Sequence, residues 1–170
     1  MKRRKFLNLT ALTVPALTMF PAELLSISRE IAKGKIEKRS LGKTGEKLSA
    51  IGFGGIVVKN ATPEQSSRRV SQAIDYGVNY FDVAPTYGDA EIKLGPALKP
   101  YRKNVFLACK TQERKKDGAL RELDQSLANL QTDYFDLYQL HAVTAMDDVD
   151  TIFSKGGAIE AFEQAKKEGK

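Results

Sequence analysis

The sequence lacks the features that would mark a cross-linked or membrane-spanning protein. Its 170 residues include one cysteine, so no internal disulfide can form. No uncharged apolar run reaches the roughly 20 residues that a membrane-spanning helix needs, and the stretch near the start contains Pro15 and Pro21, which break helices. The sequence also has no low-complexity segment and no repeat beyond an alternation of expected strands and helices. These absences leave one ordinary globular domain as the expected body of the chain.

An excess of basic over acidic residues is missing outside the first part of the chain, although the net charge is +6. Residues 1–48 contain 11 Lys and Arg against 4 Asp and Glu, whereas residues 49–170 contain 16 against 17. A nucleic-acid-binding domain clusters Lys and Arg on its folded surface. The nearest such cluster, at residues 114–116, lies in an expected loop. We therefore predict no nucleic-acid partner.

The single cysteine, Cys109, ends the apolar run 105–109 and precedes Lys110. A neighbouring cation can activate a thiol. A cysteine inside an apolar strand is, however, typically a small buried core residue, and this is the interpretation we favour.

Residues 1–35 are predicted to be an export leader and linker outside the folded domain. Charged residues 2–5 precede a stretch without charge that lasts until Glu23, which is the layout of a signal segment. Arg3 and Arg4, followed by Lys5-Phe6-Leu7, resemble the twin-arginine class. This resemblance implies the twin-arginine export machinery as a partner and a periplasmic location. A disordered basic tail on a cytoplasmic protein is the alternative, and cleavage stays open because no clean Ala-x-Ala site follows.

From residue 36 onward, expected strands and helices alternate. Two short strands, 36–40 and 47–50, flank a turn with two glycines and indicate a hairpin. Further strands are expected at 50–55, 78–82, 105–109 and 134–140, and helices at 62–76, 89–98, 117–130 and 159–167. Four apolar strands, each followed by a helix, predict an α/β fold with parallel strands.

Several helix boundaries have clear signals. Thr62 followed by Pro63 is typical of a helix start, and Gly77 of a helix end. Leucines at three- and four-residue spacing give the helix expected at 117–130 one apolar face. Tyr138, inside an expected strand, is predicted to be a core residue.

Four chemically capable side chains lie just beyond expected strands. Asp82 closes one strand, and Tyr87 follows in the next loop. Lys110 and His141, the only histidine, each follow a later strand. In a barrel of parallel strands the carboxyl ends of the strands meet at one face, where barrel enzymes keep their chemistry. An acid, a phenol, an ammonium group and an imidazole at that face indicate a proton-transfer site.

The segments 42–45, 51–55, 79–88 and 133–141 resemble those of the aldo-keto reductase family, and the resemblance covers residues 36–170. The order and spacing of the four side chains fit the family's Asp-Tyr-Lys-His tetrad. The resemblance implies a (β/α)8 TIM barrel whose floor is closed by an N-terminal hairpin, with the first four βα units in this chain. It also implies reversible hydride transfer from a nicotinamide cofactor, NADPH or alternatively NADH, to a small aldehyde or ketone.

Each tetrad residue has a chemical role in this scheme. A carbonyl group that accepts hydride becomes an alkoxide and needs a proton, which Tyr87 would donate. A phenol is a poor acid at neutral pH, but a nearby cation favours the phenolate. Lys110, held by Asp82, would be that cation. His141 would hydrogen-bond the carbonyl oxygen as charge develops on it.

The same resemblance predicts cofactor contacts at the strand ends. Glycines without side chains would let the strand-end backbone approach the nicotinamide ribose. The expected cofactor-binding residues are Gly54, Gly55, Asp82 and His141.

Structural interpretations of each feature remain open when the residues are taken singly. The acid and the lysine could form a rim ion pair, the tyrosine could pack in its loop, and the histidine could be a satisfied core residue. The paired glycines could simply permit a tight bend. We favour the catalytic site because four accidents would have to share order, spacing and strand position.

The expected fold contains four βα units, whereas a closed barrel has eight in about 250 residues. We expect the catalytic half of a longer reductase, with the C-terminal half, or a second copy of the half-barrel, as its partner. The alternative function is a non-catalytic half-barrel that acts as an interaction or regulatory module, or an inactive fragment.

Overall fold

A computed structural model describes residues 35–170. The predicted export leader, residues 1–35, lies outside the described part except for its last residue, so its role stays a prediction. Within residues 35–170, no helix is both long enough and apolar enough to cross a membrane.

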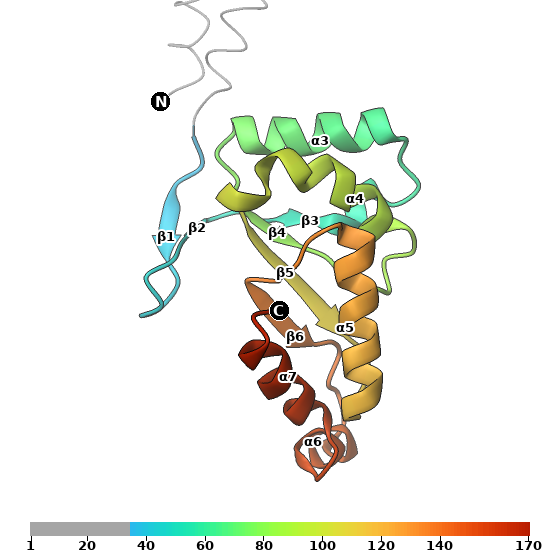
Figure 1. Ribbon diagram of the computed structural model, residues 1–170. Helices are drawn as coiled ribbons and strands as arrows, with labels where there is room; N and C mark the ends of the chain where they lie inside the picture. Colours follow the sequence, from blue (N-terminus) through green and yellow to red (C-terminus); the bar gives the residue numbers. More distant parts are fainter. Residues whose placement is uncertain (1–34) are drawn as a thin grey trace, which may run out of the picture. The chain divides into compact units, whose positions relative to one another are not determined.

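The centre of the fold is a sheet of four parallel strands in the order β3-β4-β5-β6, so each strand lies beside the next one in sequence (Figure 1). The strands are β3 (Phe53–Gly54), β4 (Tyr80–Asp82), β5 (Phe106–Thr111) and β6 (Leu137–Leu140). The predicted α/β fold with parallel strands is therefore confirmed.

Helices follow each strand and cover one face of the sheet (Figure 1). The connections contain η2 (Gly55–Val58) and α3 (Pro63–Asp75), then α4 (Ala90–Leu98) and η3 (Lys99–Asn104), then α5 (Lys116–Leu130), and finally α6 (Met146–Phe153) and α7 (Ala158–Lys167). Helix α4 packs between α3 and α5, and α5 packs against α7.

The start of α3 forms as its sequence predicts. The Thr62 side chain accepts a hydrogen bond from the backbone N–H of Gln65, and the Gln65 side chain accepts one from the Thr62 N–H at 3.0 Å. This reciprocal pair satisfies two backbone donors that no helical partner could reach. Gly77 follows the helix with φ +87°, a conformation that glycine adopts without steric cost.

The main core lies between the sheet and the helices. Phe81, Leu107 and Cys109 are almost completely buried on the helix side, and the predicted apolar face of α5 packs there through Leu123 and Leu127. These side chains come from alternate positions of β4 and β5, as expected for strands whose successive side chains point to opposite faces.

Cys109 is a buried core residue, as predicted. Its thiol lies 3.4 Å from Oε1 of Glu91, itself buried. Burial raises the pKa of the Cys109 thiol, and the charge of Glu91 raises it further. The thiol is therefore unreactive at neutral pH, because the thiolate is the nucleophilic form.

The predicted hairpin consists of β1 (Lys38–Ser40) and β2 (Lys47–Ser49), which pair antiparallel. It is tied to the residue before β4, because the Asn79 side chain accepts a hydrogen bond from the Ser49 N–H at 2.7 Å and donates one to the Lys47 carbonyl at 2.9 Å. The hairpin thus lies at the amino end of β4, as expected for a barrel floor.

Several elements differ from the sequence-based expectation. The strand expected at 50–55 is shortened to β3 (Phe53–Gly54), because Gly55 already begins η2. Lys110 lies inside β5, which continues to Thr111, and does not follow the strand. Strand β6 begins at Leu137, three residues later than expected, because residues 134–136 enter the sheet by an irregular path. Helix α6 was not predicted; it begins at Met146 without a side-chain cap, so the usual start signal is missing.

Candidate active site

The register of the strands places three of the four candidate residues on one face of the sheet. Asp82 lies opposite Ala108, and Lys110 lies opposite Gln139. Residues two apart on a strand share a face, so Lys110 lies on the same side as Asp82. His141, two residues after Gln139, continues the same row. This face is opposite the helix-covered one.

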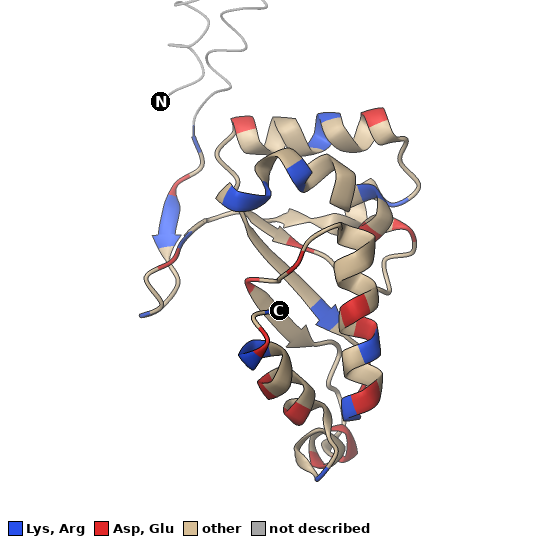
Figure 2. Cartoon of the chain, in the orientation of Figure 1, with Lys and Arg blue, Asp and Glu red and all other residues tan. Residues whose placement is uncertain are grey.

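The four strands of the sheet contain two charged residues, Asp82 and Lys110, and these form an ion pair. Figure 2 shows how little charge these strands carry compared with the helices around them. The side chains of Lys110 and Asp82 are only 13% and 25% exposed. Lys110 Nζ also donates to the Val83 carbonyl at 3.0 Å. An ammonium group has three donors, so these two bonds leave one N–H for a further partner.

Tyr87 reaches the ion pair from the loop after β4. Its backbone N–H donates to the Ala84 carbonyl at 3.0 Å, which turns the chain back over the sheet. Its ring is half-buried against the core, and its centroid lies 5.5 Å from Lys110 Nζ. Among residues 35–170, no hydrogen bond joins the Tyr87 hydroxyl to Lys110. Catalytic hydrogen bonds often close only when substrate is bound.

His141 completes the group at the end of β6. Its backbone N–H donates to the Thr111 carbonyl at 2.8 Å, which extends the ladder one residue beyond the strand. Its ring meets the Tyr87 ring edge-on, with 6.1 Å between the centroids, and its Nδ1 lies 3.4 Å from Thr86 Oγ1. The structure thus brings together all four candidate catalytic residues.

The two predicted cofactor-binding glycines differ in what surrounds them. A Cβ at Gly55 would lie 2.8 Å from the Cβ of Val83, so packing alone requires a glycine there. A Cβ at Gly54 would meet only the side chain of Ile56, at 3.9 Å. Gly54 is exposed and pairs with Asp82 in the sheet. The backbone beside the Asp82–Lys110 ion pair is therefore not covered by a side chain at this position.

Tyr80 is a member of the site that the sequence analysis missed. It lies two residues before Asp82, and its hydroxyl donates to Asp82 Oδ2 at 3.3 Å. Burial raises the pKa of the Tyr80 phenol, and the Asp82 charge raises it further. Asp82 therefore has a donor on each carboxylate oxygen. The sequence could have indicated this, because Tyr80 and Asp82 are two residues apart on one strand and therefore share a face.

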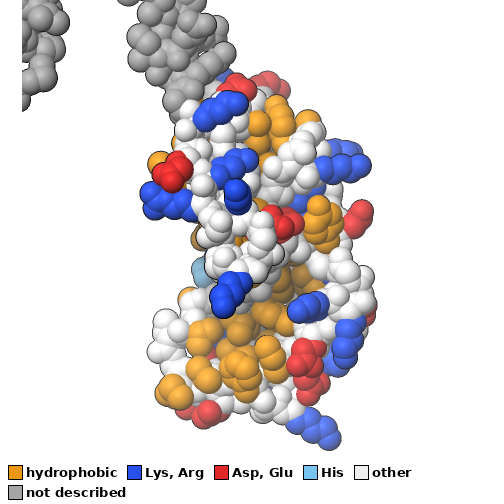
Figure 3. Space-filling model, turned by 90° about the vertical axis from the view of Figure 1, so that its left-hand side faces the viewer, with side chains coloured by type: hydrophobic (Ala, Val, Ile, Leu, Met, Phe, Trp, Pro, Cys, Tyr) orange, Lys and Arg blue, Asp and Glu red, His pale blue; other side chains and the backbone are white. Residues whose placement is uncertain are grey.

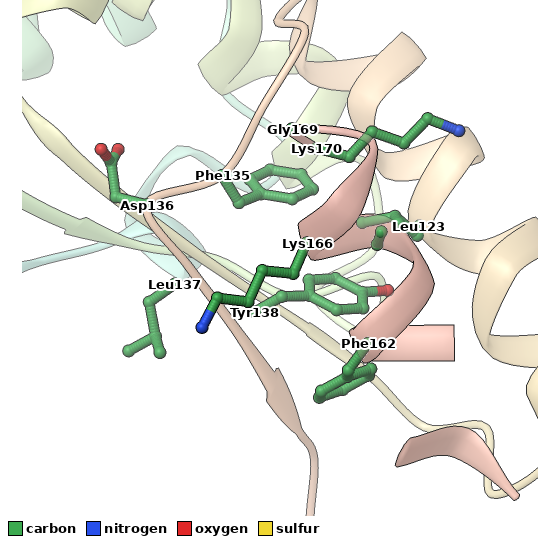
Figure 4. Close-up of a pocket in the computed structure, with 10 residues that line it drawn as sticks. Leu123, Phe135, Asp136, Leu137, Tyr138, Phe162, Lys166, Gly169 and Lys170 are labelled. Atoms are coloured by element: carbon green, nitrogen blue, oxygen red, sulfur yellow. The ribbon is translucent and has the colours of Figure 1, made fainter. Parts of the chain in front are cut away.

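A separate pocket of about 430 Å³ lies beside β6 and α7 (Figure 4). The rings of Phe135 and Tyr138 stack along it, and the Phe162 ring packs against Tyr138 at a tilt of 56°. Leu137 and Lys170 line it as well. Figure 3 shows apolar side chains gathered in the lower part of one side of the molecule. None of the four candidate catalytic residues lines this pocket, so we do not assign the chemistry to it.

Comparison with known proteins assigns the chain to a family. The model of the Aldo/keto reductase family matches residues 50–170. The chain belongs to this family. The matched range contains the acid, the phenol, the lysine and the histidine described above, and aldo/keto reductases are oxidoreductases.

Two curated relatives are each 34% identical to the chain. One is an uncharacterized oxidoreductase of Bacillus subtilis, YqkF, matched over 148 residues, or 79% of this chain and 46% of that protein. The other is L-galactose dehydrogenase of Arabidopsis thaliana, matched over 151 residues, or 80% and 46%. The chain therefore spans about half the length of the curated relatives it matches.

Solved structures confirm the predicted TIM-barrel-type fold class. An aldo-keto reductase from Pseudomonas aeruginosa superimposes with a TM-score of 0.73 at 25% identity, over 83% of this chain and 59% of that one. An aldo-keto reductase from Klebsiella pneumoniae in complex with NADPH gives a TM-score of 0.57 at 31% identity, over 73% and 43%. Residues 35–170 correspond to part of such a barrel.

Proposed function

We propose that this protein reduces an aldehyde or ketone by hydride transfer from a nicotinamide cofactor, with Tyr87 as the proton donor. One observation carries the proposal: the Lys110 ammonium group is paired with Asp82 and lies 5.5 Å from the centre of the Tyr87 ring. His141 lies on the same sheet face, in edge contact with that ring.

The strand-end backbone at Gly54 fits a nicotinamide cofactor. Gly54 is exposed beside Asp82, and a Cβ there would meet only the Ile56 side chain, at 3.9 Å. A flat ring with its ribose needs such a bare surface. NADPH is the proposed cofactor, in line with the NADPH-bound relative, and NADH is the alternative. When bound, the cofactor supplies the hydride, and the protein supplies position and a proton.

The residues of this chain then handle the charge that appears on the substrate oxygen. The imidazole of His141 donates a hydrogen bond to the carbonyl oxygen as negative charge develops there. The Tyr87 hydroxyl transfers its proton to the same oxygen, so one O–H bond breaks and another forms. Lys110 offers its remaining N–H to the phenolate left behind, and Asp82 keeps the ammonium group charged and directed. Water then returns a proton to Tyr87.

Replacement of one hydroxyl group tests this proposal. In Tyr87→Phe, kcat for a generic aldehyde should fall by roughly 10²–10⁴-fold, the usual contribution of a positioned acid. Tyr76→Phe is the matched control, because Tyr76 lies at the exposed end of α3. Cofactor oxidation is measured by absorbance, and cofactor binding by fluorescence.

The two measurements separate the possible outcomes. Unchanged turnover in Tyr87→Phe would remove Tyr87 from its role. Cofactor binding without any turnover in the unmodified protein would favour the non-catalytic alternative, a half-barrel that senses a ligand for a partner.

A further inference from the structure

We propose that Arg114 is a positioning residue that fixes the backbone on which His141 stands. Arg114 lies in the loop between β5 and α5, and its side chain is 18% exposed. Within residues 35–170 it forms no hydrogen bond or ion pair with Tyr87, Asp82 or Lys110. The kinetic consequence rests on the proposed function, whereas the structural consequence does not.

The guanidinium group of Arg114 holds the chain directly after β6. Its Nη2 donates to the carbonyl oxygens of His141, at 2.8 Å, and Ala142, at 3.1 Å. The same nitrogen pairs with Oδ2 of Asp148, at 3.2 Å, in the first turn of α6. Nη1 donates to the Gln112 carbonyl at 2.9 Å. One side chain thus joins the loop after β5, the end of β6 and the start of α6.

The backbone that Arg114 holds has an unusual conformation. Ala142 has φ +51°, in the left-handed region that residues other than glycine rarely adopt. Such a conformation persists where surrounding contacts enforce it. The hydrogen bonds from Arg114 lie on both sides of the Ala142 N–Cα–C unit, because they reach the carbonyls before and after it. We infer that Arg114 enforces this turn.

The turn determines the position and orientation of the His141 backbone. The His141 N–H is bound to the Thr111 carbonyl and its own carbonyl to Arg114, so both peptide groups of His141 are fixed. Its ring can then vary only about its side-chain bonds, where Thr86 and the Tyr87 ring limit it. A guanidinium group suits this task because its second terminal nitrogen, Nη1, also binds the Gln112 carbonyl, whereas a lysine has only one nitrogen to place.

Arg114 is itself anchored through its backbone. Its carbonyl accepts from the N–H of Ala158 at 2.9 Å, at the start of α7, and the Lys116 N–H donates to the Gly156 carbonyl at 2.9 Å. The base of the side chain is therefore held by the connection between α6 and α7, independently of His141.

Arg102 offers a matched control. Its side chain is 12% exposed, and it too donates to backbone carbonyls and a carboxylate, those of Val105, Tyr134 and Asp136. Its contacts lie before β5 and β6, at the opposite end of the sheet. Any general loss of stability should therefore follow either replacement, whereas a change at His141 should follow only Arg114→Ala.

The only histidine in the sequence makes a direct test possible. In the untagged 170-residue chain, the carbon-bound imidazole protons give signals in the NMR spectrum that need no further assignment. Arg114→Ala should move and broaden them, and Arg102→Ala should leave them in place. Unmoved signals in folded Arg114→Ala, with folding checked by circular dichroism, would overturn the proposal. If that variant does not fold, Arg114→Lys is measured under the same criterion.

Kinetics test the consequence for the reaction. Arg114→Ala should lower kcat by roughly 10–100-fold, the effect of misplacing a catalytic group by about 1 Å, with little change in KM for the cofactor. Arg102→Ala should keep the kcat of the folded fraction. A kcat that is unchanged in Arg114→Ala would overturn the kinetic role. Shifted histidine signals in a protein without turnover would instead retain the positioning role and refute the proposed function.

Discussion

Two ion pairs lie at opposite ends of the same sheet and are equally shielded from water. Arg102 and Asp136, before β5 and β6, have side chains 12% and 25% exposed; Lys110 and Asp82, near the carboxyl ends of β5 and β4, have 13% and 25%. Burial therefore does not distinguish the pair that we assign to catalysis from the one that we assign to stability.

The difference lies in what surrounds each cation. Arg102 uses its Nε, Nη1 and Nη2 on Thr132, Val105, Asp136 and Tyr134, and its guanidinium group also lies 4.0 Å from the centre of the Tyr134 ring. Lys110 makes two bonds and keeps one N–H that can turn toward the Tyr87 ring. Each cation therefore keeps one N–H, because a guanidinium group has five donors and an ammonium group has three. The free N–H of Lys110 lies beside the Tyr87 ring and can respond when charge moves there, whereas Arg102 is held among structural partners at the other end of the sheet.

The largest expected effect is on catalysis at the carboxyl end. Lys110→Met keeps the length of the side chain but removes the ammonium group, so the Tyr87 phenolate loses its stabilising cation. We expect kcat to fall by roughly 10²–10⁴-fold. Steady-state cofactor oxidation measures this. A variant with normal kcat would show that the two pairs do not differ in function.

The second effect, at the amino end, should be on stability. Arg102→Met leaves Asp136 and two backbone carbonyls with fewer donors, and we expect the free energy of unfolding to fall by about 2–4 kcal/mol. Urea denaturation followed by circular dichroism measures it. The kcat of the folded protein should not change, and a large loss of kcat here would erase the contrast between the two ends.

A smaller effect should separate the two glycines beside the carboxyl-end pair. In Gly55→Ala the new methyl group would meet the Val83 side chain, so the free energy of unfolding should fall by roughly 1–3 kcal/mol through overpacking. Gly54→Ala should leave stability nearly unchanged but weaken cofactor binding, because it covers open backbone. Equal loss of stability in both variants would contradict this distinction.

The smallest effect concerns Cys109, which is buried on the helix-covered face of β5 next to Lys110 on the other face. Burial raises the pKa of the Cys109 thiol, so the unfolded chain loses this proton at lower pH than the folded protein does. Stability from this group is complete below the ordinary thiol pKa of about 8.5 and declines above it by up to about 1.4 kcal/mol per pH unit. Cys109→Ala should reduce the slope of stability against pH between about 8.5 and 10. A slope equal to that of the unmodified protein would show that the thiol ionises freely in the folded state.

The sequence predicts the parts of the site that depend on periodicity. Asp82 and His141 could be placed at strand ends because apolar runs stop there, and the capping hydroxyl of Thr62 locates the start of α3. Lys110 was placed one residue outside its strand because a charged side chain usually ends an apolar run. Here the Asp82 carboxylate lets the strand continue past it.

The parts that the sequence does not predict depend on contacts with the backbone. Arg114 binds three carbonyl oxygens, and every residue has such an oxygen, so no residue type marks these contacts. Its carboxylate partner, Asp148, lies in the helix that the sequence analysis does not predict. Helix α6 has no side-chain cap. Apolar residues at 146, 149, 152 and 153 follow helical spacing and, with the acids of its first turn, could have identified it.

The strand register that aligns the site residues restricts which insertions and deletions the sheet can accept. Asp82, Lys110 and His141 share one face because their register differs by even numbers of residues. Loss of a single residue early in β5 would turn the lysine toward the helices and carry its charge into the apolar interior. Loss of two would keep the face but displace the lysine by about 6.6 Å along the strand. Changes of length are therefore accommodated in the loops, where no strand register is lost.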